Sequence, residues 1–87
     1  MTNVNFSQKG WEDYLYWQNQ DKKTLKRINK LIEDLSRNEG KGIGKGEILK
    51  GDLSGFCSKR IDGKNRLVYK IIENSLYIIQ CRNHYND

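Results

Sequence analysis

The spacing of apolar residues predicts two helices in the first half of the chain. Residues 2–6 alternate weakly between polar and apolar side chains, as in a short strand. Ser7 suits the N-cap of a helix whose stripe is formed by Trp11, Tyr14, Leu15 and Gln18. Asp21 suits the cap of a second helix, whose apolar positions share one face: Leu25, Ile28, Leu31, Ile32 and Leu35. The short break between the two segments predicts a helical hairpin.

The last third of the chain has the pattern of β-strands. Runs rich in apolar residues at 56–61, 66–72 and 76–83 are separated by turn residues at 62–63 and 73–75. This order predicts an α+β fold, in which a short N-terminal strand and a helical hairpin pack on a small antiparallel sheet. A chain of 87 residues has the size of one domain, so we expect residues 1–87 to form a single domain.

The length of the last turn sets the register of the final hairpin. A three-residue loop at 73–75 gives these pairs across the two strands: Ile71 with Tyr77, Tyr69 with Ile79, and Leu67 with Cys81. This face is entirely apolar, and we expect it to lie under the helices.

The opposite face of the same hairpin gathers positive charge. Arg66 lies across from Arg82 in this register, and His84 follows two residues beyond Arg82. An odd-numbered loop after Ile61 would add Arg60 to the face. Five further residues share it: Val68, Lys70, Ile72, Leu76 and Ile78. Facing arginines repel each other, so the pair calls for an anion between them, either a protein carboxylate or a phosphate.

Composition removes several classes of protein. No apolar run approaches the roughly 20 residues of a membrane span, and the N-terminus lacks a signal-peptide core, so we expect a cytoplasmic protein without membrane contact. Cys57 and Cys81 are expected to be reduced thiols, because disulfide-stapled mini-proteins usually carry four or more cysteines. Zinc is disfavoured, because Cys81 and His84 have no second histidine beside them and Cys57 is a poor third ligand. We therefore expect neither metal nor cofactor.

The net charge of +5 is concentrated in the middle of the chain. Residues 41–70 contain eight Lys or Arg against three Asp or Glu. Such a stretch suits a polyanion such as nucleic acid, although solubility alone explains it equally well. Five glycines interleaved with lysines between 40 and 51 form either a basic loop able to approach a phosphate or a plain connector.

The side chains near the basic face suit the cleavage of RNA without a metal. That reaction needs a base for the 2′-hydroxyl proton, an acid for the departing 5′-oxygen, and cations for the charge of the transition state. Glu47, His84 and the arginines have the right chemistry for these roles at neutral pH. A lone histidine near a C-terminus is more often simply an exposed residue, so the residues alone leave the question open.

A family resemblance favours the catalytic interpretation. The segments 11–18, 49–61, 65–69 and 81–85 strongly resemble the YoeB/Txe toxins, which are mRNA-cleaving members of the RelE-like superfamily in bacterial toxin–antitoxin modules. The similarity runs almost from end to end. It implies a microbial-ribonuclease-like α+β fold, ribosome-dependent cleavage of mRNA in the A site, and inhibition by a YefM-like antitoxin.

The resemblance also implies roles for individual residues. Glu47 matches the general base of the family, Arg66 the arginine that stabilises the transition state, and His84 the general acid. Four residues are expected to bind the substrate, the last of them with a lower rank: Lys50, Arg60, Tyr85 and Arg82. The chain departs from the family in having Gly46, where a proline is common, directly before the base.

A second reading makes the protein a non-catalytic nucleic-acid-binding module. It would act with its antitoxin as a corepressor, and it would touch operator DNA only through that complex. Apolar residues on both faces of the last hairpin, with exposed tryptophans on the first helix, indicate a homodimer in either case, as is frequent among relatives.

Overall fold

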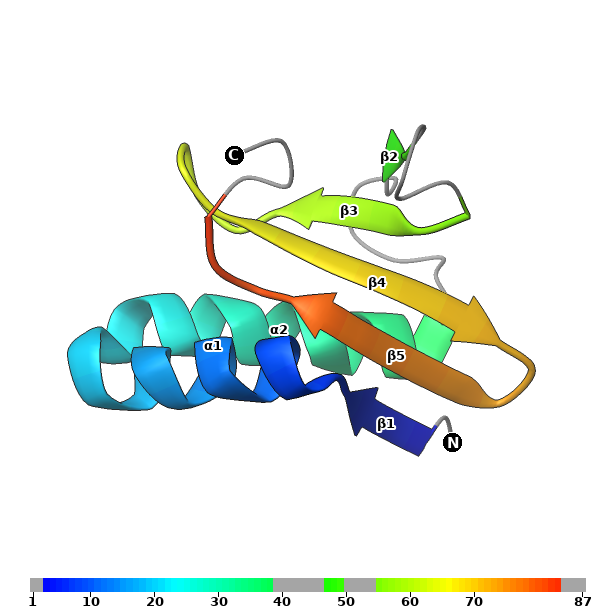
Figure 1. Ribbon diagram of the computed structural model, residues 1–87, viewed down its shortest axis with the longest axis horizontal. Helices are drawn as coiled ribbons and strands as arrows, with labels where there is room; N and C mark the ends of the chain where they lie inside the picture. The colour runs from blue at the N-terminus through cyan, green and yellow to red at the C-terminus, as the bar shows by residue number, and fades with distance from the viewer. Residues whose placement is uncertain (1–2, 39–46, 50–54, 84–87) are drawn as a thin grey trace.

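The elements follow one another in the predicted order. The computed structural model describes residues 3–38, 47–49 and 55–83 (Figure 1). Its elements are β1 (Asn3–Phe6), α1 (Gln8–Gln20), α2 (Lys22–Asn38), β2 (Glu47–Ile48), β3 (Cys57–Arg60), β4 (Arg66–Ile72) and β5 (Ser75–Gln80). The α+β prediction is confirmed, and the strand β2 is an addition that the sequence pattern did not indicate.

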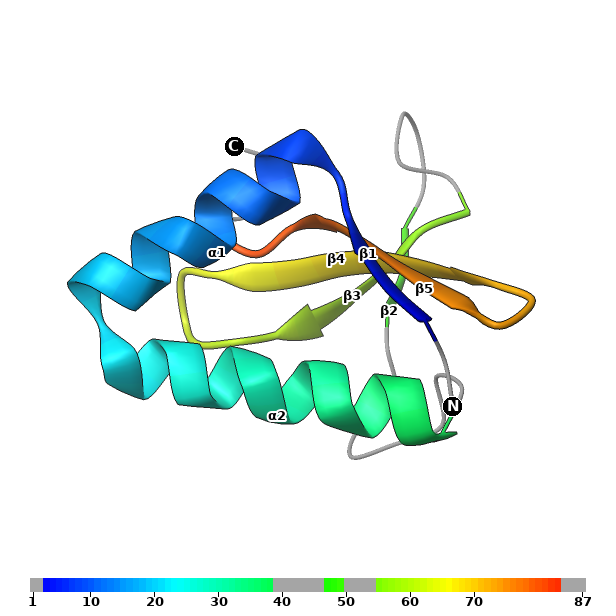
Figure 2. The same ribbon diagram turned by 90° about the horizontal axis from the view of Figure 1, so that it is seen from below.

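The five described strands form one mixed sheet in the order β1-β5-β4-β3-β2. β1 runs parallel to β5, and the other neighbours are antiparallel. Both helices lie on the same side of the sheet (Figures 1 and 2). In the described part of the chain, no helix has the length and apolar character of a membrane span.

Side-chain caps begin both helices, as predicted. The Ser7 Oγ accepts a hydrogen bond from the Gly10 N–H at 3.0 Å, at the start of α1. The Asp21 carboxylate accepts from the N–H groups of Lys23 and Thr24 at 3.1 and 3.2 Å, at the start of α2. These bonds satisfy donors that the first turn of a helix leaves without a partner.

The predicted apolar face of α2 is confirmed, whereas the predicted stripe of α1 is wrong at Trp11 and Leu15 and holds at Tyr14, which packs against the core. Ile28, Leu31 and Leu35 of α2 are fully buried in the core. On α1, Trp17 is buried, but Trp11 and Leu15 are 47% and 38% exposed. The buried residues of α1 are Gly10, Asp13 and Trp17, because this face contacts β5 and the residue that follows it.

Two polar groups of α1 fix its position against the end of β5. The Asp13 carboxylate accepts a hydrogen bond from the Cys81 N–H at 3.1 Å, and the Trp17 indole N–H donates to the Cys81 carbonyl at 2.7 Å. The periodicity of apolar residues overlooked this face because a buried aspartate is part of it. A satisfied polar group is a normal occupant of a buried site.

The predicted register of the β4–β5 hairpin is wrong near its turn. The connecting turn has two residues, Glu73 and Asn74, so Ile71 pairs with Leu76 and Tyr69 pairs with Ile78. Glu73 adopts a left-handed φ of 53°, which makes the shorter turn possible. Because a shift of one residue exchanges the two faces, Leu76 and Ile78 are buried in the core, and Tyr77 is exposed.

An irregularity in the ladder restores the predicted register at the other end of the hairpin. The register shifts between Val68 and Tyr69, and beyond this point Val68 pairs with Gln80. The extra residue, Ile79, lies on β5. The Cys81 side chain consequently faces the core, as predicted, and is fully buried there.

Candidate active site

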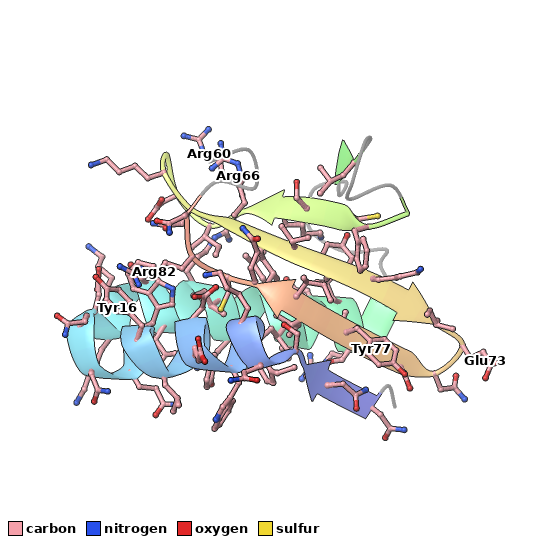
Figure 3. The ribbon with its side chains drawn as sticks, in the orientation of Figure 1. Tyr16, Arg60, Arg66, Glu73, Tyr77 and Arg82 are labelled. Atoms are coloured by element: carbon pink, nitrogen blue, oxygen red, sulfur yellow. The ribbon has the colours of Figure 1, made fainter. Side chains whose placement is uncertain are left out.

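Two arginines lie side by side at one end of the sheet, on the face away from the helices. Arg60, the last residue of β3, is paired with Arg66, the first residue of β4. Their side chains both reach the turn that joins the two strands (Figure 3). The Arg66 Nη1 donates to the carbonyl oxygens of Asp62 and Asn65 at 2.6 and 3.0 Å, and the Arg60 Nε donates to the Asp62 carbonyl at 3.3 Å. The prediction that Arg60 joins Arg66 is confirmed.

The carboxylate nearest to this arginine pair is occupied by the turn itself. The Asp62 Oδ1 accepts from the backbone N–H groups of Lys64 and Asn65 at 2.8 and 2.7 Å and from the Asn65 amide at 3.0 Å. Within residues 3–38, 47–49 and 55–83, no ion pair joins either guanidinium to a carboxylate. Within this part of the chain, the turn engages the Asp62 carboxylate through its own N–H donors, and the two guanidinium groups bond to backbone carbonyls instead.

The Asp62 carboxyl stays ionised because of these hydrogen bonds. Partial burial acts to raise its pKa, but the bonds from the Asn65 amide and the turn N–H groups, together with the Arg66 charge, outweigh burial and lower the pKa below 3.8. The turn is thus held by a carboxylate at all physiological pH values.

The expected pair of Arg66 and Arg82 is not formed. The Arg82 guanidinium lies 3.6 Å from the centroid of the Tyr16 ring on α1, away from the arginine pair (Figure 3). Its backbone neighbour Cys81 is held by α1, so the chain after β5 follows the helix rather than continuing the ladder. Cation–π stacking gives the guanidinium a partner there.

The backbone of Glu47 lies two rows of the sheet away from the arginine pair. Glu47 is paired with Ser58, Ser58 with Val68, and Val68 with Gln80, so these four residues form one row across the sheet. The row formed by Arg60 and Arg66 is two residues further along the same strands. The sequence pattern placed Glu47 in a glycine-rich loop, whereas it begins a strand.

The residue before His84 is fastened to the same turn. The Asn83 N–H donates to the Asn65 Oδ1 at 2.7 Å, and the Asn83 carbonyl accepts from the Arg66 N–H at 3.1 Å. Asn83 has a φ of 66°, a left-handed conformation that asparagine tolerates well. Three predicted site residues lie outside the described residues: Lys50, His84 and Tyr85.

Sequence reasoning missed the polar residues of the turn, Asp62 and Asn65. It recognised residues 62–63 as a turn, and the spacing of an aspartate three residues before an asparagine was visible. That spacing is compatible with a side chain that binds its own turn. The bond from Asn65 to Asn83 spans 18 residues, and no local pattern could have indicated it.

The cysteines lie too far apart for a disulfide. Cys57 is on β3 and Cys81 directly follows β5, so β4 separates them. Two strand spacings are about 9.6 Å, more than the Cα distance of a disulfide. Burial raises the pKa of the Cys81 thiol to about 12, with a further contribution from Asp13, so this thiol stays protonated. The described residues contain no group of three or more side chains placed to hold a metal ion.

The two guanidinium groups present hydrogen-bond donors of the kind that a phosphate accepts. A guanidinium presents five N–H donors, and the bonds to the turn occupy only some of them. Two such groups on neighbouring strands can contact different oxygens of one phosphate. The bonds to backbone carbonyls hold both groups in place before an anion arrives, so little ordering is required on binding.

Comparison with known proteins identifies a family. Residues 6–85 match the profile of a family described as the YoeB-like toxin of bacterial type II toxin–antitoxin systems. A curated relative, Toxin YoeB of Streptomyces coelicolor, is 54% identical over 82 residues, which cover 94% of this chain and 98% of that protein.

Two solved structures from Staphylococcus aureus share the fold. One is a heterotetrameric YoeB–YefM toxin–antitoxin complex, with 44% identity, a TM-score of 0.86, and coverage of 98% of this chain and 99% of that chain. The other is a YoeB dimer, with 45% identity, a TM-score of 0.86, and coverage of 97% and 98%.

Proposed function

Because the chain belongs to the YoeB-like toxins of bacterial type II toxin–antitoxin systems, we propose that it is an endoribonuclease that cleaves mRNA in the ribosomal A site. It would act in the cytoplasm and block translation there. The observation that carries the proposal is the arginine pair, Arg60 and Arg66, whose guanidinium groups are fixed by one turn and have no carboxylate partner among the described residues.

The proposed reaction is a transfer of the phosphoryl group within the RNA. Glu47 removes the proton of a 2′-hydroxyl, whose oxygen attacks the adjacent phosphorus. The bond from phosphorus to the 5′-oxygen breaks, and His84 donates a proton to that oxygen. The products are a 2′,3′-cyclic phosphate and a free 5′-hydroxyl, and the Arg66 guanidinium stabilises the additional negative charge of the transition state.

The protonation states required are those of ordinary side chains near pH 7. A glutamate with a pKa near 4.3 is ionised and can accept a proton, and a histidine with a pKa near 6.5 is partly protonated and can donate one. These groups supply both proton transfers and the compensating charge, so we propose chemistry that does not depend on a metal. Arg60, Lys50 and Tyr85 would hold the phosphate or a substrate base, with a lesser role for Arg82.

We further propose that the chain forms a homodimer and binds a YefM-like antitoxin. The two Staphylococcus aureus structures contain such assemblies of a relative. The net charge of +5 suits an acidic antitoxin segment that covers the arginine pair. Contact with operator DNA would then pass through the antitoxin, and not through this chain.

Toeprinting of a defined mRNA on programmed ribosomes tests the activity. We expect wild-type protein to cut in the A site, and Glu47→Ala, His84→Ala and Arg66→Ala to slow cutting by about 10²–10⁴-fold each. Lys26→Ala is the matched control, because it removes one exposed positive charge from α2 and should cut as the wild type does.

An intact message with folded wild-type protein would overturn the proposal. Salt-sensitive RNA binding without cutting would then identify the alternative, a non-catalytic binding module that acts as a corepressor with the antitoxin. Cutting that is unchanged in Glu47→Ala and His84→Ala would retain the enzyme but contradict the assigned acid and base.

A further inference from the structure

We propose that Asn65 is a positioning residue, which fixes the chain segment entering His84 against Arg66 and which is itself oriented by Asp62. The inference rests on the proposed function for its catalytic meaning, because it takes Arg66 and His84 as members of one site. The geometry that supports it concerns Asp62, Asn65, Arg66 and Asn83, all of which the structure describes.

Two consecutive residues at the start of β4, Asn65 and Arg66, bind the two backbone polar groups of Asn83. Its N–H donates to the side chain of Asn65 at 2.7 Å, and its carbonyl accepts from the backbone N–H of Arg66 at 3.1 Å. Asn83 lies beyond the end of β5, so these bonds take the place of ladder pairing. The residue that precedes the proposed acid is thereby held next to Arg66.

Asp62 determines which way the Asn65 amide points. An ionised carboxylate only accepts hydrogen bonds, so the Asn65 Nδ2 must face Asp62, and it does so at 3.0 Å from both carboxylate oxygens. The Asn65 Oδ1 is then directed toward the Asn83 N–H, which can only donate. Asp62 and the Asn83 N–H therefore both require the same orientation of the Asn65 amide. Asn65 is also nearly buried, with 9% of its surface exposed.

Such fixing has a catalytic consequence because proton transfer depends on distance. A donor on an unanchored chain end samples many positions, and a displacement of about 1 Å can lower a rate about 100-fold. Because Asn83 is anchored, the residue directly before the proposed acid is in place before the substrate binds, and the rate lost to displacement is smaller. Asn65 touches no substrate in this account, so its effect would pass entirely through Asn83.

A pair of variants separates positioning from general damage to the fold. Asn65→Asp keeps an acceptor for the Asn83 N–H, but it loses the donor toward Asp62 and places two carboxylates next to each other, so we expect their repulsion to displace residue 65 and weaken its hold on Asn83. In the double variant Asp62→Asn/Asn65→Asp, the amide of residue 62 can donate to the carboxylate of residue 65, which can again accept from the Asn83 N–H, while the oxygen of residue 62 still accepts from the turn N–H groups. Asn29→Asp is the matched control, because it makes the same substitution on α2, at another asparagine whose Oδ1 accepts a 2.7 Å hydrogen bond, here from the Tyr14 hydroxyl.

His84 provides a readout that does not depend on activity. It is the single histidine of the chain, so its imidazole signals in a ¹H–¹³C NMR spectrum are unambiguous. We expect Asn65→Asp to move the His84 signals and their titration midpoint away from those of the wild type. The double variant and Asn29→Asp should return the wild-type values. Thermal unfolding of each variant verifies that the comparison is made on folded protein.

The cleavage assay then tests the catalytic meaning of the same contact. On programmed ribosomes, we expect Asn65→Asp to cut about 10- to 100-fold more slowly than wild type, and the double variant to recover to within about threefold. Wild-type His84 signals in folded Asn65→Asp, or a double variant as slow as the single one, would overturn the inference. If wild-type protein cuts nothing, the proposed function fails, and the NMR comparison still decides whether Asn65 positions the segment.

Discussion

At the scale of residues, Asp62 organises the arginine pair without neutralising it. Its side chain accepts hydrogen bonds from its own turn, and its carbonyl oxygen accepts from both Arg60 and Arg66. The guanidinium groups are therefore held by hydrogen bonds to a carbonyl oxygen, while the Asp62 carboxylate acts on Arg66 through its charge and not through a direct ion pair. A site of this kind keeps its attraction for an anion while its side chains are already ordered.

The stability of the protein should depend on the ionisation of Asp62. Since the pKa of this carboxyl is lower in the folded protein than the unfolded value of 3.8, its contribution is complete above that value and is lost as the pH falls through the folded pKa. Urea unfolding at pH 7 and at pH 2 should show a loss of roughly 0.5–1 kcal/mol that is absent in Asp62→Asn, a modest value because the group is exposed to solvent.

Glu12→Gln is the control for this measurement, since it also removes one exposed carboxyl group. The Glu12 carboxylate has a single hydrogen bond, from the Gln8 amide at 3.3 Å. If the free energy of unfolding of Asp62→Asn fell as much between pH 7 and pH 2 as that of the wild type, ionisation of Asp62 would not stabilise the turn.

At the scale of elements, caps and apolar faces were predictable, but contacts between elements were not. Ser7 and Asp21 act within a few residues of themselves, and the α2 face follows from spacing alone. The face of α1 depends on Cys81, which lies more than 60 residues away in the sequence. The register of β4 and β5 depends on the left-handed Glu73, a conformation that its residue type disfavours.

In the candidate site, too, local relations were predictable from the sequence and contacts between elements were not. Arg60 and Arg66 were correctly placed on one face, because an odd loop and strand alternation determine that relation. Arg82 was misplaced, because its stacking on Tyr16 requires knowledge of where α1 lies. The roles of Glu47 and His84 rest on family resemblance and stay predictions.

Gly10 allows α1 to approach β5 closely, and its substitution should separate the two elements. A Cβ atom at Gly10 would lie 2.5 Å from the Ile78 carbonyl oxygen, a backbone atom that cannot move alone. We expect Gly10→Ala to lower the free energy of unfolding by about 1–3 kcal/mol, although alanine favours helix by about 1 kcal/mol. Chemical denaturation measures the difference.

Gly63→Ala is the matched control for Gly10→Ala. A Cβ atom there would meet only the Arg60 side chain, at 3.8 Å, and the backbone of Gly63 is not left-handed. We expect it to be neutral or to stabilise by less than about 1 kcal/mol. Equal stabilities of the two variants would show that α1 has room at Gly10.

At the scale of the whole molecule, one face of the sheet is covered by helices and the other carries the candidate site. Large apolar side chains are nevertheless exposed on both sides of the molecule: Val4, Trp11, Leu15, Ile72 and Tyr77. Exposed apolar side chains of this size in a small protein indicate surfaces that contact other chains. This observation agrees with the proposed dimer without selecting its interface.

Static light scattering tests the proposed dimer directly. At tens of micromolar, we expect twice the mass of one chain, with a fall toward one chain on dilution if the association is reversible. The same measurement in high salt is the control, since an apolar interface should persist where contacts between charges are screened. A single-chain mass at tens of micromolar in both conditions would contradict the dimer.

The parallel pairing of β1 with β5 has a consequence for synthesis. β1 and β5 are the first and the last of the described strands in sequence, yet they are neighbours, and β5 lies between β1 and β4 in the sheet. Before residues 75–80 have left the ribosome that makes them, β1 and β4 have no common neighbour, and α1 has no Cys81 to hold. The described sheet can therefore be completed only after residues 75–80 have left the ribosome, which makes the formation of this sheet a late step in folding.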